Sequence, residues 1–89
     1  MDIEYHASKA AANLKKHGIS FDEAASVLLD CDALVMEDRD SVAEKRWIIV
    51  GISDRARLLT VIYTVRNNEC FRLISARKAT RNEGYYCAQ

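Results

Sequence analysis

The chain has 89 residues, of which 49% are hydrophobic, with three glycines, no proline and a formal net charge of zero. This composition excludes a disordered chain, and no apolar run approaches the roughly 18 residues that a membrane span requires. Residues 1–4 contain two acidic residues and do not begin the apolar stretch of a secretory signal peptide. The sequence therefore predicts a cytoplasmic protein with a single domain over residues 1–89.

Charge is distributed unevenly along the chain. Residues 1–44 contain four Lys or Arg and ten Asp or Glu, whereas residues 45–89 contain nine and three. A fold that separates these halves presents one acidic and one basic surface, and a fold that interleaves them cancels the field. The sequence leaves both possibilities open.

The three cysteines, Cys31, Cys70 and Cys87, lie far apart in the sequence. There is no Cys-x-x-Cys pair and no histidine at metal-ligand spacing from a cysteine, and structural zinc needs such clustered ligands. We therefore expect reduced thiols and no metal site.

The first predicted helix covers residues 7–17. Its apolar residues recur at helical spacing, which places Ala10 and Leu14 on the buried side and Asn13 on the solvent side. Gly18 is positioned to end this helix in the left-handed conformation.

A capping box formed by Ser20 and Glu23 opens a second predicted helix over residues 21–30. The Ser20 hydroxyl can accept a hydrogen bond from the Glu23 amide, while the Glu23 carboxylate can reach back. Because the link between the helices is short, the sequence predicts a tight helical hairpin.

The rest of the chain has the alternation and composition of strands. After a short N-terminal strand near Ile3, strands are predicted for residues 33–37, 46–53, 57–66 and 70–77. Short links make consecutive strands antiparallel, and a second capping box at Thr80 and Glu83 opens a short terminal helix. The predicted fold is α+β: an N-terminal helical hairpin packed on an antiparallel sheet of about four strands, followed by a short C-terminal helix.

Residues 9–21, Lys-Ala-Ala-Ala-Asn-Leu-Lys-Lys-His-Gly-Ile-Ser-Phe, resemble the N-terminal signature of the BrnT toxin family, a branch of the RelE-like ribonucleases. Later segments resemble the family in the same order, namely residues 44–46, 50–51 with 57–59, 63–66, 72–77 and 79–83. The resemblance implies a RelE-like fold, RNA cleavage during growth arrest, and no metal or organic cofactor. It also implies a BrnA-type ribbon-helix-helix antitoxin, bound as a hetero-oligomer that represses its own operon and contacts operator DNA only through the antitoxin.

Cleavage of RNA without a metal uses the 2′-hydroxyl as nucleophile, and cations that stabilise the phosphorane supply the largest contribution. Arg66 and Arg77 each end a predicted strand, where a side chain can point into a groove. Our hypothesis is that both bind the scissile phosphate; the alternative is that they are solvated arginines.

Three further residues are candidates for catalysis. Arg46 and Glu44 flank the start of a strand and are either electrostatic and acid–base helpers or a surface ion pair. His17 has the side chain suited to proton transfer near neutrality, although at a helix end it is equally able to bind backbone carbonyls.

Candidate RNA-binding residues are Lys16, Arg72, Lys78 and Tyr63. Tyr63 could stack on a base, but as a mid-strand aromatic residue it is more typical of core packing. Two other functions fit the sequence: an inert module that only binds its antitoxin, and an unrelated small α+β protein that binds nucleic acid.

Overall fold

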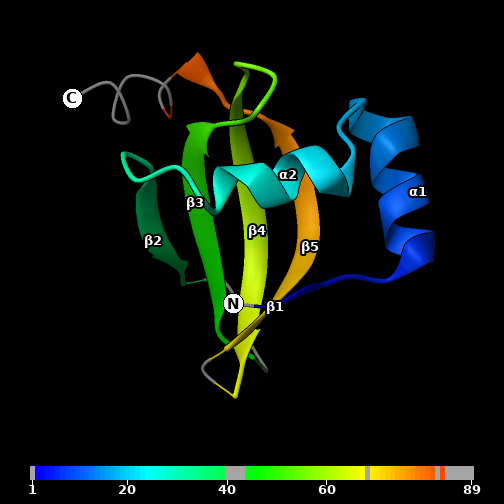
Figure 1. The fold of residues 1–89 in the computed structure, drawn as a ribbon, viewed down its shortest axis with the longest axis vertical. Helices are drawn as coiled ribbons and strands as arrows, with labels where there is room; N and C mark the ends of the chain where they lie inside the picture. Colours follow the sequence, from blue (N-terminus) through cyan, green and yellow to red (C-terminus); the bar gives the residue numbers. More distant parts are fainter. Residues whose placement is uncertain (1, 40–43, 68, 82, 84–89) are drawn as a thin grey trace.

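The computed structural model describes residues 2–39, 44–67, 69–81 and 83. Two helices and a five-stranded sheet make up this part of the chain (Figure 1). In chain order the elements are β1 (Asp2–Glu4), α1 (Ala7–His17), α2 (Phe21–Val27), β2 (Leu34–Asp38), β3 (Arg46–Ile52), β4 (Leu58–Arg66) and β5 (Cys70–Lys78). No helix among the described residues is long and apolar enough to cross a membrane.

The sheet has the strand order β1-β5-β4-β3-β2 and is mixed. β2 to β5 are antiparallel neighbours, as their short links predicted. β1 instead pairs in parallel with β5, with Ile3 opposite Phe71. The prediction of an antiparallel sheet of about four strands was wrong at this edge, because the pairing joins opposite ends of the chain and leaves no local signal.

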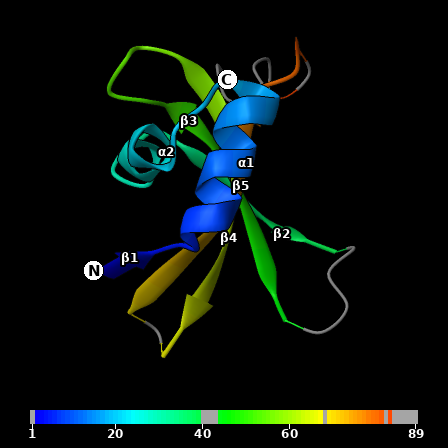
Figure 2. The ribbon, with the colours of Figure 1, turned by 90° about the vertical axis from the view of Figure 1, so that its right-hand side faces the viewer.

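The two helices do not form the predicted tight hairpin. α2 crosses one face of the sheet over β3, β4 and β5, whereas α1 lies along the β5 edge (Figure 1, Figure 2). Gly18 ends α1 with a φ of 71°, and Ser20 caps α2 by accepting a hydrogen bond from the Glu23 amide at 3.1 Å, both as predicted. Because Ile19 between them is buried in the core, each helix docks on the sheet rather than on the other helix.

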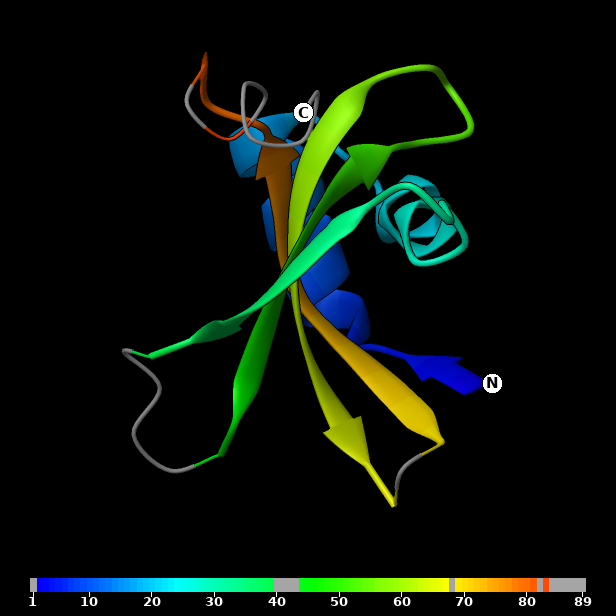
Figure 3. The ribbon, with the colours of Figure 1, turned by 90° about the vertical axis from the view of Figure 1, so that its left-hand side faces the viewer.

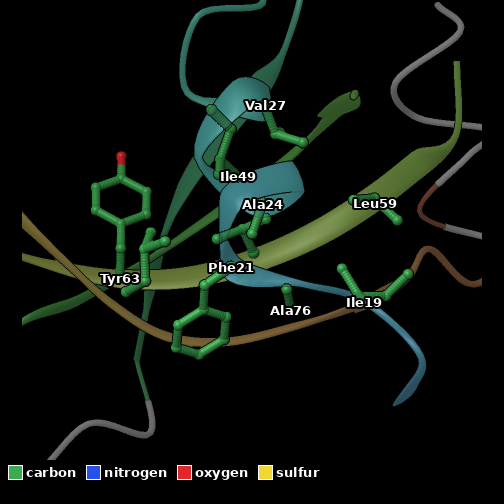
Figure 4. Packing of buried hydrophobic residues seen from close by; sticks show 10 residues of the cluster. Ile19, Phe21, Ala24, Val27, Ile49, Leu59, Tyr63 and Ala76 are labelled. Atoms are coloured by element: carbon green, nitrogen blue, oxygen red, sulfur yellow. The ribbon is translucent and has the colours of Figure 1, made fainter. Parts of the chain in front are cut away.

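The hydrophobic core fills the space between the helices and one face of the sheet (Figure 4). Its buried members are Ile19, Phe21, Ala24, Val27, Ile49, Leu59, Val61, Tyr63, Leu73 and Ala76. Side chains alternate along a strand, so the neighbours of these residues in β3, β4 and β5 point to the opposite face.

A polar residue attaches α1 to the sheet. Asn13 is 6% exposed, and its side-chain nitrogen donates hydrogen bonds to the carbonyls of Ile19 at 3.0 Å and Ala76 at 2.9 Å. Its side-chain oxygen accepts from the Ala76 amide at 3.0 Å. The prediction that Asn13 faces solvent while Leu14 is buried was wrong, since Leu14 is 52% exposed. The spacing of apolar residues along a helix does not show that a polar side chain is needed to bond the backbone of a neighbouring strand, as Asn13 does at Ala76.

α2 ends at Val27, three residues before its predicted end. Beyond it, the Asp30 carboxylate accepts hydrogen bonds from the amides of Asp32 at 3.0 Å and Ile52 at 2.8 Å, which turns the chain toward β2. The Asp30 carboxylate lies so close to the backbone of β3 that only glycine fits at position 51, because a Cβ there would be 2.8 Å from this carboxylate.

The Glu23 carboxylate does not reach back to cap α2 but binds the β3–β4 turn. Glu23 is 3% exposed and accepts hydrogen bonds from the Ser53 hydroxyl at 2.7 Å and from Nε of Arg57 at 2.8 Å, with a second Arg57 nitrogen on its other oxygen. The Arg57 guanidinium holds the pKa of Glu23 below its ordinary value, although burial alone would raise it.

The predicted terminal helix lies mostly outside the described residues. Its capping box is formed in both directions: the Glu83 amide donates to the Thr80 hydroxyl at 3.2 Å, and the Thr80 amide donates to the Glu83 carboxylate at 2.7 Å.

Candidate functional site

The sheet face opposite the core, here called the open face, collects arginines from three strands. Arg46 of β3, Arg66 of β4 and Arg72 of β5 belong to this face because the residues beside them along each strand pack against the core. In antiparallel order β3 begins, β4 ends and β5 begins at the same end of the sheet. The three residues, here called the arginine end, therefore lie together.

Thr64 lies at the centre of the arginine end. It is directly opposite Arg72 of β5, and the register of β3 places Arg46 on its other side. Strand spacing puts the backbones of Arg46 and Arg72 about 10 Å apart, and Arg66 follows Thr64 by two residues, about 7 Å along the strand. Three long side chains at these separations can converge on one phosphate group.

Carboxylates hold two of the three guanidinium groups. Nε of Arg72 donates to Glu4 at 3.1 Å, and Nε of Arg66 lies 3.6 Å from a carboxylate oxygen of Glu44. The sequence suggested a surface ion pair between Glu44 and Arg46, but Glu44 pairs with Arg66 instead. Within the described part of the chain Arg46 has no ion pair. These pairs are partly exposed and contribute little stability, which leaves the guanidinium groups open to exchange with another anion.

The Thr64 hydroxyl is buried without a partner. Thr64 is 2% exposed, and its Oγ1 has no hydrogen-bond partner among the described residues. Buried hydroxyl groups are nearly always hydrogen-bonded, so the Thr64 hydroxyl is free to bond a group that approaches from outside the described residues. At Cys70, which lies opposite Arg66, burial and then the charge of Glu4 raise the pKa of the thiol and keep it neutral.

Arg77 lies on the open face but far from the arginine end. It is opposite Thr60, six residues from Arg66 along β4, which separates the two arginines by about 20 Å. The hypothesis that Arg66 and Arg77 share one scissile phosphate therefore does not fit the structure. Both end a strand, but antiparallel neighbours end at opposite sides of the sheet.

His17 and Lys16 come together in a groove between α1 and β5. The groove measures about 250 Å³ and also includes Lys9 and Ser75. Ser75 is on the open face, opposite Ile62, so the basic side of α1 borders that face.

Tyr63 and Lys78 do not join the arginine end. Tyr63 is 7% exposed on the core side, where its ring packs edge-on against Phe71 with centroids 5.6 Å apart, and burial raises the pKa of its hydroxyl. Lys78 is exposed at the end of β5, and alternation directs it to the side opposite Arg77.

Sequence reasoning missed Thr64 and Glu4. The alternation within β4 places Thr64 on the same face as Arg66, so the pattern contained a signal for it. No sequence pattern indicated Glu4, because its contact with Arg72 depends on the parallel pairing of β1 with β5.

Within the described residues, potential metal ligands gather at Asp30, Cys31 and Asp32, with ligand atoms within 4.8 Å of one another. Both Asp30 oxygens already accept backbone hydrogen bonds, and the loop lies at the end of the sheet away from Arg66. Cys31 and Cys70 are free thiols, as expected, and Cys87 lies outside the described residues.

The fold and the arginine end define a small α+β protein with partly exposed guanidinium groups gathered at one end of the sheet face opposite the core, an arrangement suited to polyanions. The structure is similar to the crystal structure of the Brucella abortus ribonuclease toxin, BrnT, with a TM-score of 0.70 and 25% sequence identity. That similarity covers 91% of this chain and 99% of the Brucella chain. No protein with a curated description matches the chain.

The family described as "Ribonuclease toxin, BrnT, of type II toxin-antitoxin system" matches residues 5–83. The chain belongs to this family. Membership supports the role of a ribonuclease toxin and implies an antitoxin partner, as the N-terminal signature predicted.

Proposed function

We propose that this chain is a metal-independent endoribonuclease toxin of the cytoplasm, whose arginine end binds the scissile phosphate of RNA. The observation that supports the proposal is that Arg46, Arg66 and Arg72 occupy neighbouring positions on three adjacent strands around the buried Thr64. A rigid sheet fixes their backbones, so the positive charges are oriented before RNA arrives.

In the proposed reaction the 2′-oxygen attacks the adjacent phosphorus and the bond from phosphorus to the 5′-oxygen breaks. The products are a 2′,3′-cyclic phosphate and a 5′-hydroxyl. The 2′-hydroxyl gives its proton to a base and the leaving 5′-oxygen receives one, while the arginines stabilise the dianionic phosphorane. Glu44, which is half exposed beside Arg66, is the proposed proton acceptor.

Bound RNA replaces the carboxylates that hold Arg66 and Arg72. Each pair consists of partly exposed side chains, so a phosphate can displace the carboxylate at small cost. We assign the groove at Lys16 and His17 to the RNA strand on one side of the reacting phosphate, because Ser75 connects this groove to the open face.

The partner in this proposal is a ribbon-helix-helix antitoxin of the BrnA type. The toxin and antitoxin form a hetero-oligomer that represses their own operon, with operator DNA contacted by the antitoxin. The family's place in type II toxin–antitoxin systems supports a protein partner of this kind.

Cleavage of single-stranded RNA by purified variants tests the site. Arg66→Ala and Arg72→Ala are expected to lower the cleavage rate by about a hundredfold or more, the effect of removing one oriented donor. Arg55→Ala is the matched control, because Arg55 is an exposed arginine on the turn between β3 and β4. Circular dichroism confirms that each variant is folded. Full activity in folded Arg66→Ala and Arg72→Ala would overturn the assignment.

The inert antitoxin-binding module is the second candidate. The zero net charge and the carboxylates on Arg66 and Arg72 favour it, because both weaken attraction to RNA. Wild-type protein that binds the antitoxin tightly but leaves RNA intact would establish this alternative.

A further inference from the structure

β2 is an edge strand with apolar side chains on both faces. It pairs with β3 on one side, and no strand in the described part of the chain pairs with its other side (Figure 3). Leu34 and Met36 are 36% and 40% exposed on the open face, and Val35 is 48% exposed on the face of the core. Exposed edges are normally protected by charged side chains, proline or a bulge; β2 has neither proline nor a bulge, and its charged residues, Glu37 and Asp38, are confined to its C-terminal end.

A pocket lies beside the edge on the core face. It measures about 490 Å³, with an apolar wall formed by Val35, Trp47, Tyr63 and Val65 and with Glu44 and Lys45 as its charged lining residues. A strand placed next to β2 would point alternate side chains toward Val35 and the mouth of this pocket. The edge therefore combines free strand pairing with a place for an apolar anchor.

The surroundings of the edge are acidic. Residues 29–39 contain four acidic side chains and one basic side chain, and Asp32 and Glu37 among them are exposed. Hydrogen bonds from the Ile52 and Asp32 amides lower the pKa of Asp30, so this carboxylate stays ionised. A second copy of the chain would bring like charges together at this edge, whereas a basic segment would be attracted.

We propose that β2 is the docking edge for the antitoxin, which adds a basic strand with alternating apolar side chains and places one of them in the pocket beside Val35. This inference rests on the proposed function, because it takes the toxin's antitoxin as the occupant. Glu44 lines the same pocket and contacts Arg66, so a segment bound there lies beside the arginine end. An antitoxin side chain in this pocket would lie against Glu44, the proposed proton acceptor, so occupation of the edge would also block the site.

The test measures affinity of the full chain for its cognate antitoxin by calorimetry, and RNA cleavage by each free variant. Val35→Lys replaces an apolar contact with a repelling charge and is expected to weaken binding at least tenfold. Glu37→Lys is expected to weaken it several-fold and to reduce its dependence on salt. Leu14→Lys is the matched control, because Leu14 is a similarly exposed apolar residue on α1. None of the three variants is expected to lose RNA cleavage.

Hydrogen exchange distinguishes strand addition from contact through side chains alone. Backbone amides of β2 are expected to become protected when antitoxin is added to the wild-type chain. Unchanged affinity in folded Val35→Lys, or no added protection in β2, would overturn the proposal, as would a wild-type homodimer that Val35→Lys dissociates. A chain that fails to cleave RNA contradicts the proposed function alone, since binding and protection are measured without that activity.

Discussion

Arg77 is held by both oxygens of the Glu83 carboxylate, at 2.8 and 2.9 Å. One of these oxygens also accepts hydrogen bonds from the Thr60 hydroxyl at 2.9 Å and the Thr80 amide at 2.7 Å. This carboxylate therefore joins the end of β5 to the segment that follows it, at the end of the open face opposite Arg66.

We expect Glu83→Gln to remove part of the acid dependence of stability. The Arg77 hydrogen bonds lower the pKa of Glu83 from 4.5 to about 2. A carboxyl group with a folded-state pKa below its unfolded value stabilises the fold above about pH 4.5, and this contribution is lost as the pH falls toward 2. Urea unfolding between pH 2 and 7 should show a flatter profile in Glu83→Gln. Glu69→Gln, which changes an exposed carboxylate, should match the wild type.

We expect Arg77→Ala to lower stability and to leave RNA cleavage within a few-fold of the wild type. Its backbone is about 20 Å from that of Arg66 along the sheet, and its guanidinium is bound by Glu83. Thermal unfolding and RNA cleavage, measured on the same preparation, separate the two effects. A hundredfold loss of cleavage in a folded Arg77→Ala protein would place Arg77 in the site after all.

Glu23→Gln should destabilise the fold by about 1.5–3 kcal/mol, the range for a hydrogen bond to a charged group, because Arg57 is partly exposed. The substitution leaves the Arg57 guanidinium without its charged partner and weakens the junction between α2 and the β3–β4 turn. Asp22→Asn is the control, because Asp22 is exposed one position earlier in the same helix. Equal unfolding free energies for the two variants in urea would contradict the role assigned to Glu23.

Asn13→Leu should cost about 2–4 kcal/mol, although it makes α1 more apolar. The change leaves the buried amide and carbonyl of Ala76 without their side-chain partner. The reverse change at the neighbouring position, Leu14→Asn, should have an effect below about 1 kcal/mol because Leu14 is half exposed. Denaturant unfolding of both variants checks the prediction, and a neutral Asn13→Leu would rule out the attachment of α1 through this side chain.

Local signals were sufficient wherever a structural feature depends on residues close in sequence. The Gly18 C-cap, the Ser20 N-cap and the antiparallel order of β2 to β5 were all predicted correctly. Each depends on a short-range hydrogen bond or a short link, which neighbouring residue types encode directly. The family could be recognised for the same reason, since residues 9–21 form a continuous signature.

The sequence by itself thus determined the order of the described helices and strands, the caps at Gly18 and Ser20, and the family. Only the tertiary structure decided which arginines share one end of the sheet: Arg66 lies near Arg46 and Arg72, and Arg77 lies at the other end. Strand register and edge pairing arise from hydrogen bonds between distant segments, and β1 on β5 or Asn13 on Ala76 leaves no trace in local residue patterns. The composition of the candidate site follows from these long-range pairings.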